Sequence, residues 1–302
     1  MARLNIGAQP FVRWQGSKSQ YLRILDQALP ANFASIPDVT YIEPFVGGGA
    51  MLFHMLQTYP NISRVVINDS NLDLMRVYNT VRDRSSELIG ELKKIEREFL
   101  PLSDERRRIC FEKAHEEFGE RLADGTRHAA LFIFLSKTSV GGAQQKYHPT
   151  VRPVICDEAT LLADARILQR VTILCDDYEK TYNEACGNTF FFLDPPYRPL
   201  SGAKPGEWDD REQVRLKKFC DLLNFRHFDW MLTNSDGKTK NPTDNFMEQL
   251  YSNYDIQRIY SAPALKATPE KRAKLSELLV RNFNREIAAL RDLRCTQLSL
   301  AF

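Results

Sequence analysis

A four-residue motif near the middle of the chain combines an acid, two prolines and an aromatic ring: Asp194, Pro195, Pro196 and Tyr197. It follows the apolar run 189–193, which is typical of a buried strand in a parallel sheet. Because two prolines cannot continue a hydrogen-bonded ladder, the strand has to end at Leu193 or Asp194 and lead into a rigid loop. Ligands of open α/β sheets bind at this carboxyl edge. A carboxylate, a carbonyl between prolines and a ring face could hold an amine on a flat ring, although an ordinary strand with a proline turn has the same pattern.

A glycine loop precedes this motif in the chain. The β-branched and aromatic run 39–43 is followed by Gly47, Gly48 and Gly49 and then by the helical pattern 50–56. Strand, glycine loop and helix in this order are typical of nucleotide-binding turns, where the backbone approaches the ligand closely. A plain tight turn is the alternative. The next expected strand, 64–68, ends at Asp69, roughly 20 residues after the loop, which suits an acid that binds ribose hydroxyls.

Four motifs occur in an order that resembles the Dam-type (D12 class, alpha-group) DNA adenine-N6 methyltransferases: Arg13-Trp14-Gln15-Gly16-Ser17-Lys18, Glu43-Pro44-Phe45-Val46-Gly47-Gly48-Gly49, Asn68-Asp69-Ser70-Asn71 and Asp194-Pro195-Pro196-Tyr197. Later stretches are similar to the DpnII-type branch: 131–138, 155–158, 177–181, 232–236 and 277–282. The resemblance extends from about Pro10 to about Phe283. It implies an α/β fold, with a Rossmann-like S-adenosylmethionine-dependent methyltransferase sheet and an inserted helical target-recognition domain.

The same resemblance implies S-adenosyl-L-methionine as the cofactor. The residues that would bind it are Trp14, Gly16, Lys18, Glu43, Phe45, Gly47, Gly49, Asp69, Asp177, Tyr178 and Asp194. Several have simpler alternatives, which the sequence leaves open. Asp69 could cap the next helix, Lys18 could be a surface lysine, and Glu43 could pair internally. Asp194 could cap the end of its strand.

The catalytic residues expected from the motif are Asp194, Pro195, Pro196 and Tyr197. The amino nitrogen of adenine is a poor nucleophile, and in a duplex the base has to be flipped out before it can react. Asp194 and the Pro195 carbonyl would accept the two amino hydrogens, while Tyr197 would stack on the ring. Positioning and electrostatics would then do most of the work.

Helical periodicity dominates the part of the chain after Asp69, at 71–83, 85–99, 104–119 and 126–137. We therefore expect a catalytic domain formed by 1–80 and 171–302, with 81–170 as a helical target-recognition insertion. Strands are expected at 171–175, 228–233, 255–260 and 278–283, and helices at 19–29, 209–223 and 243–251. The loop 139–153 contains glycines and basic residues, which could reach into a DNA groove or form an ordinary solvated loop.

Four basic residues are the candidates for DNA contact: Arg13, Lys137, Lys146 and Arg152. A further basic loop, 266–274, could contact phosphates. The resemblance favours adenine within GATC as the target. Against GATC, the loop 139–152 and the segment 201–208 depart from the pattern of GATC-specific members. Gln144, Gln145 and Lys146 could substitute as base-reading residues.

Composition limits the remaining possibilities. The 302 residues contain six cysteines without metal-ligand spacing, and the net charge of +2 is too small to establish a polyanion partner. No apolar run approaches a membrane span. We expect a cytoplasmic monomer with reduced thiols, nucleoid-associated when it is on DNA, with double-stranded DNA as partner and neither metal nor membrane. A cognate restriction endonuclease could be its genetic partner.

Two other functions remain open on the sequence. One is a methyltransferase that acts on RNA adenine or on a protein glutamine, although those enzymes usually carry Asn in place of Asp194 and lack the helical insertion. The other is a DNA-binding protein that has lost catalysis, which the intact Asp194-Pro195-Pro196-Tyr197 motif and the glycine loop disfavour.

Overall fold

A computed structural model describes residues 7–121, 125–142, 144–149, 153–199, 208–261 and 276–283. They form two compact units. The first takes its described residues from 7–19, 46–59 and 67–177, so the glycine loop and the helical block belong to the same unit. The second takes them from 20–45, 60–66 and 178–283 and contains the Asp194 motif.

The strands form a seven-stranded sheet in the order β3-β2-β1-β4-β5-β7-β6. Their bounds are β1 Val39–Glu43, β2 Ile62–Asn68, β3 Val171–Leu174, β4 Thr189–Leu193, β5 Asp229–Ser235, β6 Asp255–Tyr260 and β7 Ser276–Arg281. β4 is parallel to β1 and β5, whereas β7 is antiparallel to β5 and β6. This order is the dinucleotide-binding order 3-2-1-4-5-6 with one antiparallel strand inserted next to the edge. The expected Rossmann-like α/β fold is therefore confirmed.

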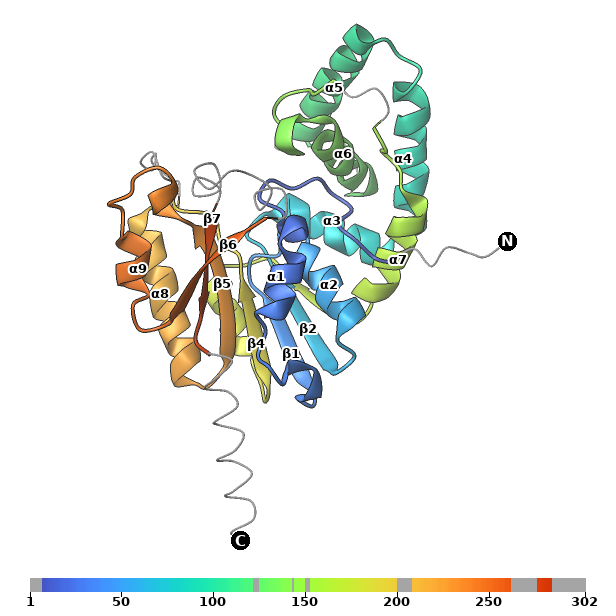
Figure 1. Cartoon of the computed structure of the whole chain (residues 1–302). Coiled ribbons are helices and arrows are strands. Elements are labelled where there is room, and N and C mark those ends of the chain that lie inside the picture. The colour runs from blue at the N-terminus through green and yellow to red at the C-terminus, as the bar shows by residue number, and fades with distance from the viewer. Residues whose placement is uncertain are drawn as a thin grey trace, which may run out of the picture. The chain divides into compact units, whose positions relative to one another are not determined.

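Strand β4 is central because its sequence suits burial on both faces. All five of its residues are buried, and its register pairs Phe191 with Trp230 of β5 and Ile42 of β1. Helix α8 (Asp210–Phe225) packs along β5, with α9 (Phe246–Leu250) near it (Figure 1). This apolar packing holds β4 within the sheet, and the prolines after it end the strand where the Asp194 motif begins.

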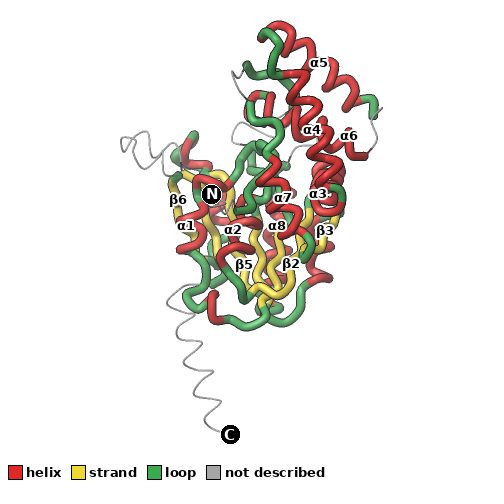
Figure 2. Tube along the Cα trace, turned by 90° about the vertical axis from the view of Figure 1, so that its right-hand side faces the viewer, coloured by secondary structure: helices red, strands yellow, loops and turns green. Residues whose placement is uncertain are grey.

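The helical block consists of α3 (Leu72–Asp83), α4 (Ser85–Phe99), α5 (Asp104–Gly119), α6 (Gly125–Thr138) and α7 (Glu158–Leu168). Helix α6 is its core, because α3, α4 and α5 all pack on it and most of its residues are buried. Figure 2 shows the trace of these helices. Ser103 caps α5 by accepting a hydrogen bond from the amide of Arg106, and Asn71 caps α3 in the same way from Leu74.

Three helical elements differ from the expected ones. Helix α7 was not among the expected helices, although Asp157 caps it at the amide of Thr160. The expected helix 19–29 is a 3-10 turn at Lys18–Gln20 followed by α1 (Leu22–Gln27). Helix α9 (Phe246–Leu250) is shorter than the expected 243–251, because the chain before it forms a turn in which the Asp244 amide donates to the Asn241 carbonyl at 2.9 Å.

Within the described residues, two kinds of feature are absent: a membrane-spanning helix and a metal-binding group. None of their helices has the length and apolar character of a membrane span. Within these same ranges, no group of three His, Cys, Asp or Glu side chains is arranged to hold a metal. The cysteines among them, Cys110, Cys156, Cys175, Cys186 and Cys220, are free thiols.

Candidate active site

In the second unit, the Asp194 motif leaves the carboxyl end of β4, as the sequence predicts. The register of β4 on β5 pairs Leu193 with Leu232, which brings Thr233 beside Asp194. The Thr233 hydroxyl donates a hydrogen bond of 2.6 Å to Asp194 Oδ1. The carboxylate is thus oriented by the neighbouring strand and remains half-buried.

Tyr197 is anchored through its hydroxyl, which donates to Glu277 Oε2 on β7 at 2.5 Å. Burial raises the pKa of Tyr197 well above its ordinary value, and the carboxylates of Asp194 and Glu277 raise it further. Tyr197 is therefore protonated at any physiological pH, and the hydrogen bond to Glu277 holds the hydroxyl end of its ring.

The two prolines of the motif differ in exposure: Pro195 is buried and Pro196 is exposed. The side-chain amide of Gln213 on α8 donates to the Pro196 carbonyl at 3.5 Å. No described residue donates a hydrogen bond to the Pro195 carbonyl. That carbonyl is therefore available as an acceptor next to Asp194.

Glu43 at the end of β1 is 2% exposed. Its Oε2 accepts a hydrogen bond of 2.9 Å from the Tyr41 hydroxyl, so the internal pairing that the sequence left open is formed. Burial raises the pKa of Glu43 well above its ordinary value, and the charge of Asp194 adds to the shift. Glu43 is thus biased toward the neutral carboxylic acid.

Phe45 and Tyr178, both predicted to bind the cofactor, contact each other with their ring centroids 5.0 Å apart. Trp208, which the sequence did not single out, packs edge-on against Phe45 at 5.6 Å. Its indole Nε1 is buried and has no hydrogen-bond partner among the described residues. Three rings and an unused donor suit a flat heteroaromatic ligand such as adenine.

In the first unit, the glycine loop is shaped by Trp14 and Tyr78. Gly47 has φ +48°, and a Cβ there would lie 2.7 Å from the Trp14 indole nitrogen. The Tyr78 hydroxyl donates to the Gly47 carbonyl at 3.0 Å, and a Cβ on Gly49 would meet the same hydroxyl at 2.5 Å. Only glycine allows this close approach, so Trp14 lies directly against Gly47 and the Tyr78 hydroxyl against Gly49.

Asp69 joins this cluster through its carboxylate. Oδ2 accepts from the Gly47 amide at 3.2 Å, and Oδ1 accepts from the Asn71 amide at 2.9 Å. Burial raises the pKa of Asp69, while these two hydrogen bonds oppose the shift. Since Asn71 caps α3, Asp69 is not needed as the helix cap.

Lys18 is 3% exposed, so it is not a surface lysine. Its Nζ donates to the Gly16 carbonyl at 2.8 Å, and Gly16 has φ +78°. A buried ammonium next to a glycine turn suits a polar ligand rather than a solvated face.

Asn68 is a residue that the motif contained without being assigned a role. It is 1% exposed, and its side chain exchanges two hydrogen bonds with the backbone of Asp176, at 2.9 and 3.0 Å. Asp176 in turn accepts from the amide of Asp177 at 2.7 Å. Asn68 thereby ties the loop that carries Asp177 to the end of β2. The signal available in the sequence was an Asn directly after the apolar run 65–67 and directly before the acid.

The four basic candidates for DNA contact differ in exposure. Arg13 and Lys146 are exposed. Lys137 is half-buried, its Nζ donates to the Ile155 carbonyl at 3.2 Å, and burial lowers its pKa. Arg152 and the basic loop 266–274 lie outside the described residues.

The backbone of Arg13 packs directly on a glycine of the loop after α6. A Cβ on Gly142 would lie 2.2 Å from the Arg13 carbonyl oxygen. The loop itself is a small hairpin, in which Ser139 bridges to Tyr147 and the amide of Val140 donates to the Lys146 carbonyl at 2.9 Å. The Arg13 backbone therefore lies against the same hairpin that carries Lys146.

The sheet order and the Asp194 loop define a class of protein, the Rossmann-like methyltransferases. The family model for the D12 class N6 adenine-specific DNA methyltransferases matches residues 14–266, and this chain belongs to that family. It is therefore an adenine-specific DNA methyltransferase.

Similar proteins come from both archaea and bacteria. The type II methyltransferase M.MjaIII of Methanocaldococcus jannaschii is 33% identical over 293 residues, which cover 91% of this chain and 99% of the relative. The type II methyltransferase M1.LlaDCHI of Lactococcus lactis subsp. cremoris is 26% identical over 300 residues, which cover 92% and 96%. The DNA adenine methylase of Escherichia coli (strain K12) is 25% identical over 247 residues, which cover 75% and 80%.

Proposed function

We propose that this enzyme transfers a methyl group from S-adenosyl-L-methionine to the exocyclic amine of an adenine flipped out of duplex DNA. The observation that carries the proposal is the loop after β4, where the carboxylate of Asp194 and the Pro195 carbonyl are adjacent acceptors. When bound, the cofactor supplies a methyl group already activated by the sulfonium.

The residues of the loop would act on the target amine. Asp194 and the Pro195 carbonyl would accept hydrogen bonds from its two N–H groups and turn the nitrogen lone pair toward the methyl group. The N–C bond would form as the methyl group leaves the sulfur, and the amine would lose a proton only after it is methylated. The Thr233 hydroxyl holds the carboxylate for this role at 2.6 Å. Tyr197 would stack on the flipped base, and the hydrogen bond from its hydroxyl to Glu277 restrains the position of the ring.

Both units supply residues that suit the cofactor. In the first unit, we assign the ribose hydroxyls to Asp69 and a polar end of the cofactor to Lys18, with Trp14, Gly16, Gly47 and Gly49 shaping the surface. In the second unit, Phe45 and Tyr178 would bind the adenine ring, helped by Trp208. Asp177 would contact the polar edge of the adenine, and Glu43, whose pKa is raised by burial, would contact the methionine moiety.

We further propose that 81–170 is a target-recognition insertion in a catalytic domain formed by 1–80 and 171–302. Support comes from α4 and α5, which lie within 81–170 and both pack on the buried helix α6. Arg13 and Lys146 are the exposed candidates for DNA contact. Lys137 is directed instead to the Ile155 carbonyl, so its contribution to DNA binding would be indirect.

GATC is the proposed recognition sequence. Its support is the DpnII-type resemblance together with Arg13, which can pair bidentately with guanine. The test is to express the protein in a host without adenine methylation and to map modified adenines by single-molecule sequencing. We expect modified adenines in GATC. Modification of another motif alone would refute the specificity and leave the chemistry intact.

An RNA- or protein-directed methyltransferase is the competing function, and one assay separates it. Labelled S-adenosylmethionine is incubated with the protein and with duplex DNA, RNA or protein. We expect label in duplex DNA only. Label in none of the three would favour a DNA-binding protein without catalysis.

Arg13→Ala is expected to relax the requirement at one base beside the target adenine. Arg13 is exposed, while its neighbour Trp14 packs on the glycine loop. A bidentate contact to guanine O6 and N7 is worth about 1–3 kcal/mol of discrimination. The check is the methylation rate on duplexes in which each neighbouring base is replaced in turn. Lys146→Ala serves as the comparison for general basic character. An equal loss on all duplexes would reduce Arg13 to a phosphate contact.

Two relatives carry type II methyltransferase names, which are typical of restriction–modification systems. We therefore propose a cognate restriction endonuclease as the genetic partner. Separately, we propose that the active form is a monomer.

A further inference from the structure

The backbone of the catalytic loop forms hydrogen bonds with side chains of α8 and β5. Besides the contact from Gln213 to Pro196, the Ser235 hydroxyl donates to the Arg198 carbonyl at 3.1 Å. The Arg198 amide donates to Asn234 Oδ1 at 3.4 Å. Gln213 and Asn234 are fully buried and bonded to each other at 3.0 Å. Tyr197 thus lies between two backbone anchors, one on each side of it in the chain.

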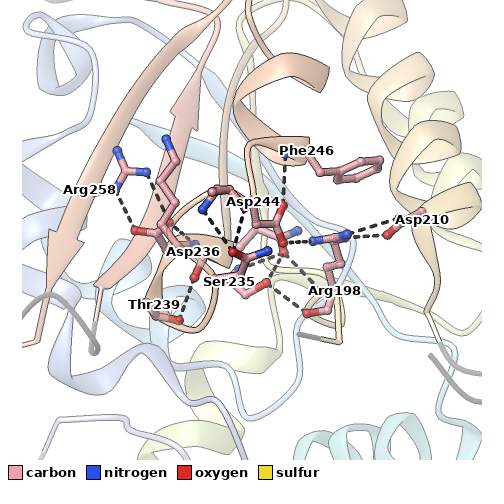
Figure 3. Close-up of polar contacts among 12 residues, drawn as sticks. Arg198, Asp210, Ser235, Asp236, Thr239, Asp244, Phe246 and Arg258 are labelled. Atoms are coloured by element: carbon pink, nitrogen blue, oxygen red, sulfur yellow. Dashed lines mark hydrogen bonds and ion pairs between the residues drawn. The ribbon is translucent and has the colours of Figure 1, made fainter. Parts of the chain in front are cut away.

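The side chain of Arg198 extends this anchoring to two helix starts (Figure 3). Its Nε and one terminal nitrogen donate to the two oxygens of Asp210, at 2.5 and 3.3 Å. The other terminal nitrogen donates to Asp244 Oδ2 at 2.6 Å. The guanidinium also lies 4.5 Å from the ring centroid of Phe246. Asp210 begins α8 and Phe246 begins α9, so Arg198 joins the catalytic loop to both helices.

Asp244 is fixed independently of Arg198. Its Oδ1 accepts from the Phe246 amide at 3.1 Å, and its own amide donates to the Asn241 carbonyl at 2.9 Å. A Cβ on Gly237 would come within 2.6 Å of the Asp244 carboxylate. Arg198 therefore binds to a carboxylate that is already in place.

An arginine directly after a catalytic motif in a DNA enzyme would ordinarily be assigned to a phosphate. Arg198 does not suit that role, because its side chain is 17% exposed and its donors already face two carboxylates. Moving it to DNA would leave Asp244, which is 19% exposed, without its cation. The planar fork of arginine suits simultaneous pairing with two acids, whereas a lysine is a single point charge.

We propose that Arg198 is a positioning residue, which holds the catalytic loop in register with β5, α8 and α9 and makes no contact with DNA. This inference rests on the proposed role of Asp194, Pro195 and Tyr197. If the ion pairs of the Arg198 side chain or the hydrogen bonds of its backbone are lost, the loop can shift as a unit and its two acceptors move relative to the amine. A misplacement of about 1 Å can cost about 10²-fold in rate.

The test compares Arg198→Ala with Arg211→Ala. Arg211 is a matched control, because it also pairs with an aspartate at the start of α8 but its side chain is 92% exposed. For Arg198→Ala we expect kcat to fall by about 10²-fold. Cofactor affinity and the salt dependence of DNA binding should stay unchanged. Arg198→Lys should recover only part of the rate, and Arg211→Ala should behave as wild type.

Ser235→Ala is the second variant, in case Arg198→Ala does not fold. It removes only the hydroxyl that donates to the Arg198 carbonyl and a longer bond of 3.4 Å to Asn234. Its kcat should fall by a smaller factor, with unchanged binding of cofactor and DNA. Thermal unfolding of each variant establishes that the folded protein is being assayed.

Three outcomes would overturn the proposal. If Arg198→Ala lowers the slope of log affinity against log salt by about one, Arg198 is a phosphate contact. If it keeps wild-type kcat, the loop needs no such anchor. If Arg198→Lys is fully active, the paired fork is irrelevant. Asp194→Ala is run alongside, since an active Asp194→Ala would refute the proposed chemistry itself, whereas an inactive one with an active Arg198→Ala refutes only the positioning role.

Discussion

Asp194→Ala is expected to abolish methyl incorporation while the protein still binds S-adenosylmethionine. The carboxylate is oriented by Thr233 at 2.6 Å and follows a fully buried strand, so its place is set before any ligand arrives. Loss of one preorganised polar group at a reacting centre typically costs about 10²–10³ in kcat. We expect at least this effect here, because Asp194 would supply one of only two acceptors. Methyl incorporation into duplex DNA and cofactor binding by calorimetry are the two measurements.

Thr233→Val is the matched control for this prediction. It removes the hydroxyl that orients Asp194 and keeps the carboxylate, so the loss of activity should be smaller than in Asp194→Ala. Asp194→Asn keeps one acceptor oxygen and should retain some activity. Wild-type turnover in Asp194→Ala would remove Asp194 from the mechanism and return it to the role of a strand-end cap.

Asp69→Ala is expected to weaken cofactor binding and to affect the chemical step much less. A charge-assisted hydrogen bond to the ribose is worth about 1.5–3 kcal/mol. Loss of one such bond should raise the Kd for S-adenosylmethionine about 10- to 150-fold. Asp69 also accepts a hydrogen bond from the Gly47 amide. Asp69→Ala therefore loosens the glycine loop as well, which should also weaken cofactor binding. Calorimetric titration gives the Kd directly.

Asn71→Ala separates cofactor binding from helix capping. Asn71 caps α3 at the Leu74 amide, and loss of such a cap costs about 0.5–2 kcal/mol of stability. We expect a lower thermal midpoint for Asn71→Ala and an unchanged Kd. If Asp69→Ala instead shows an unchanged Kd and only a lower midpoint, its role is structural.

The local parts of this fold were predictable from sequence. Helices α4 and α5 have the bounds that their periodicity indicates, and β6 spans the expected 255–260. The two prolines predict that β4 ends at Leu193 or Asp194, and it ends at Leu193. Such features depend on residues close together in the chain, where propensity, capping and missing donors act directly.

Helix α7 has a local start signal in the sequence but a weak apolar periodicity. Asp157 caps it and Glu158 lies in its first turn, which is a recognised start signal. The stretch 155–158 was interpreted only as a family motif. Its small buried residues, such as Ala163, make the apolar periodicity weak.

By itself, the sequence determined the family-typical motifs, the Rossmann-like class and the residue types that could hold an amine or a ribose. Only the tertiary structure decided what those residues contact. Lys18 is buried and Glu43 pairs with Tyr41. Trp208 packs against Phe45, although the two are 163 positions apart in the sequence. The Arg198 guanidinium pairs with Asp210 and Asp244. The physical reason is common to all of them: burial, and partners brought together by strand register and helix packing, depend on distant segments that no local pattern encodes.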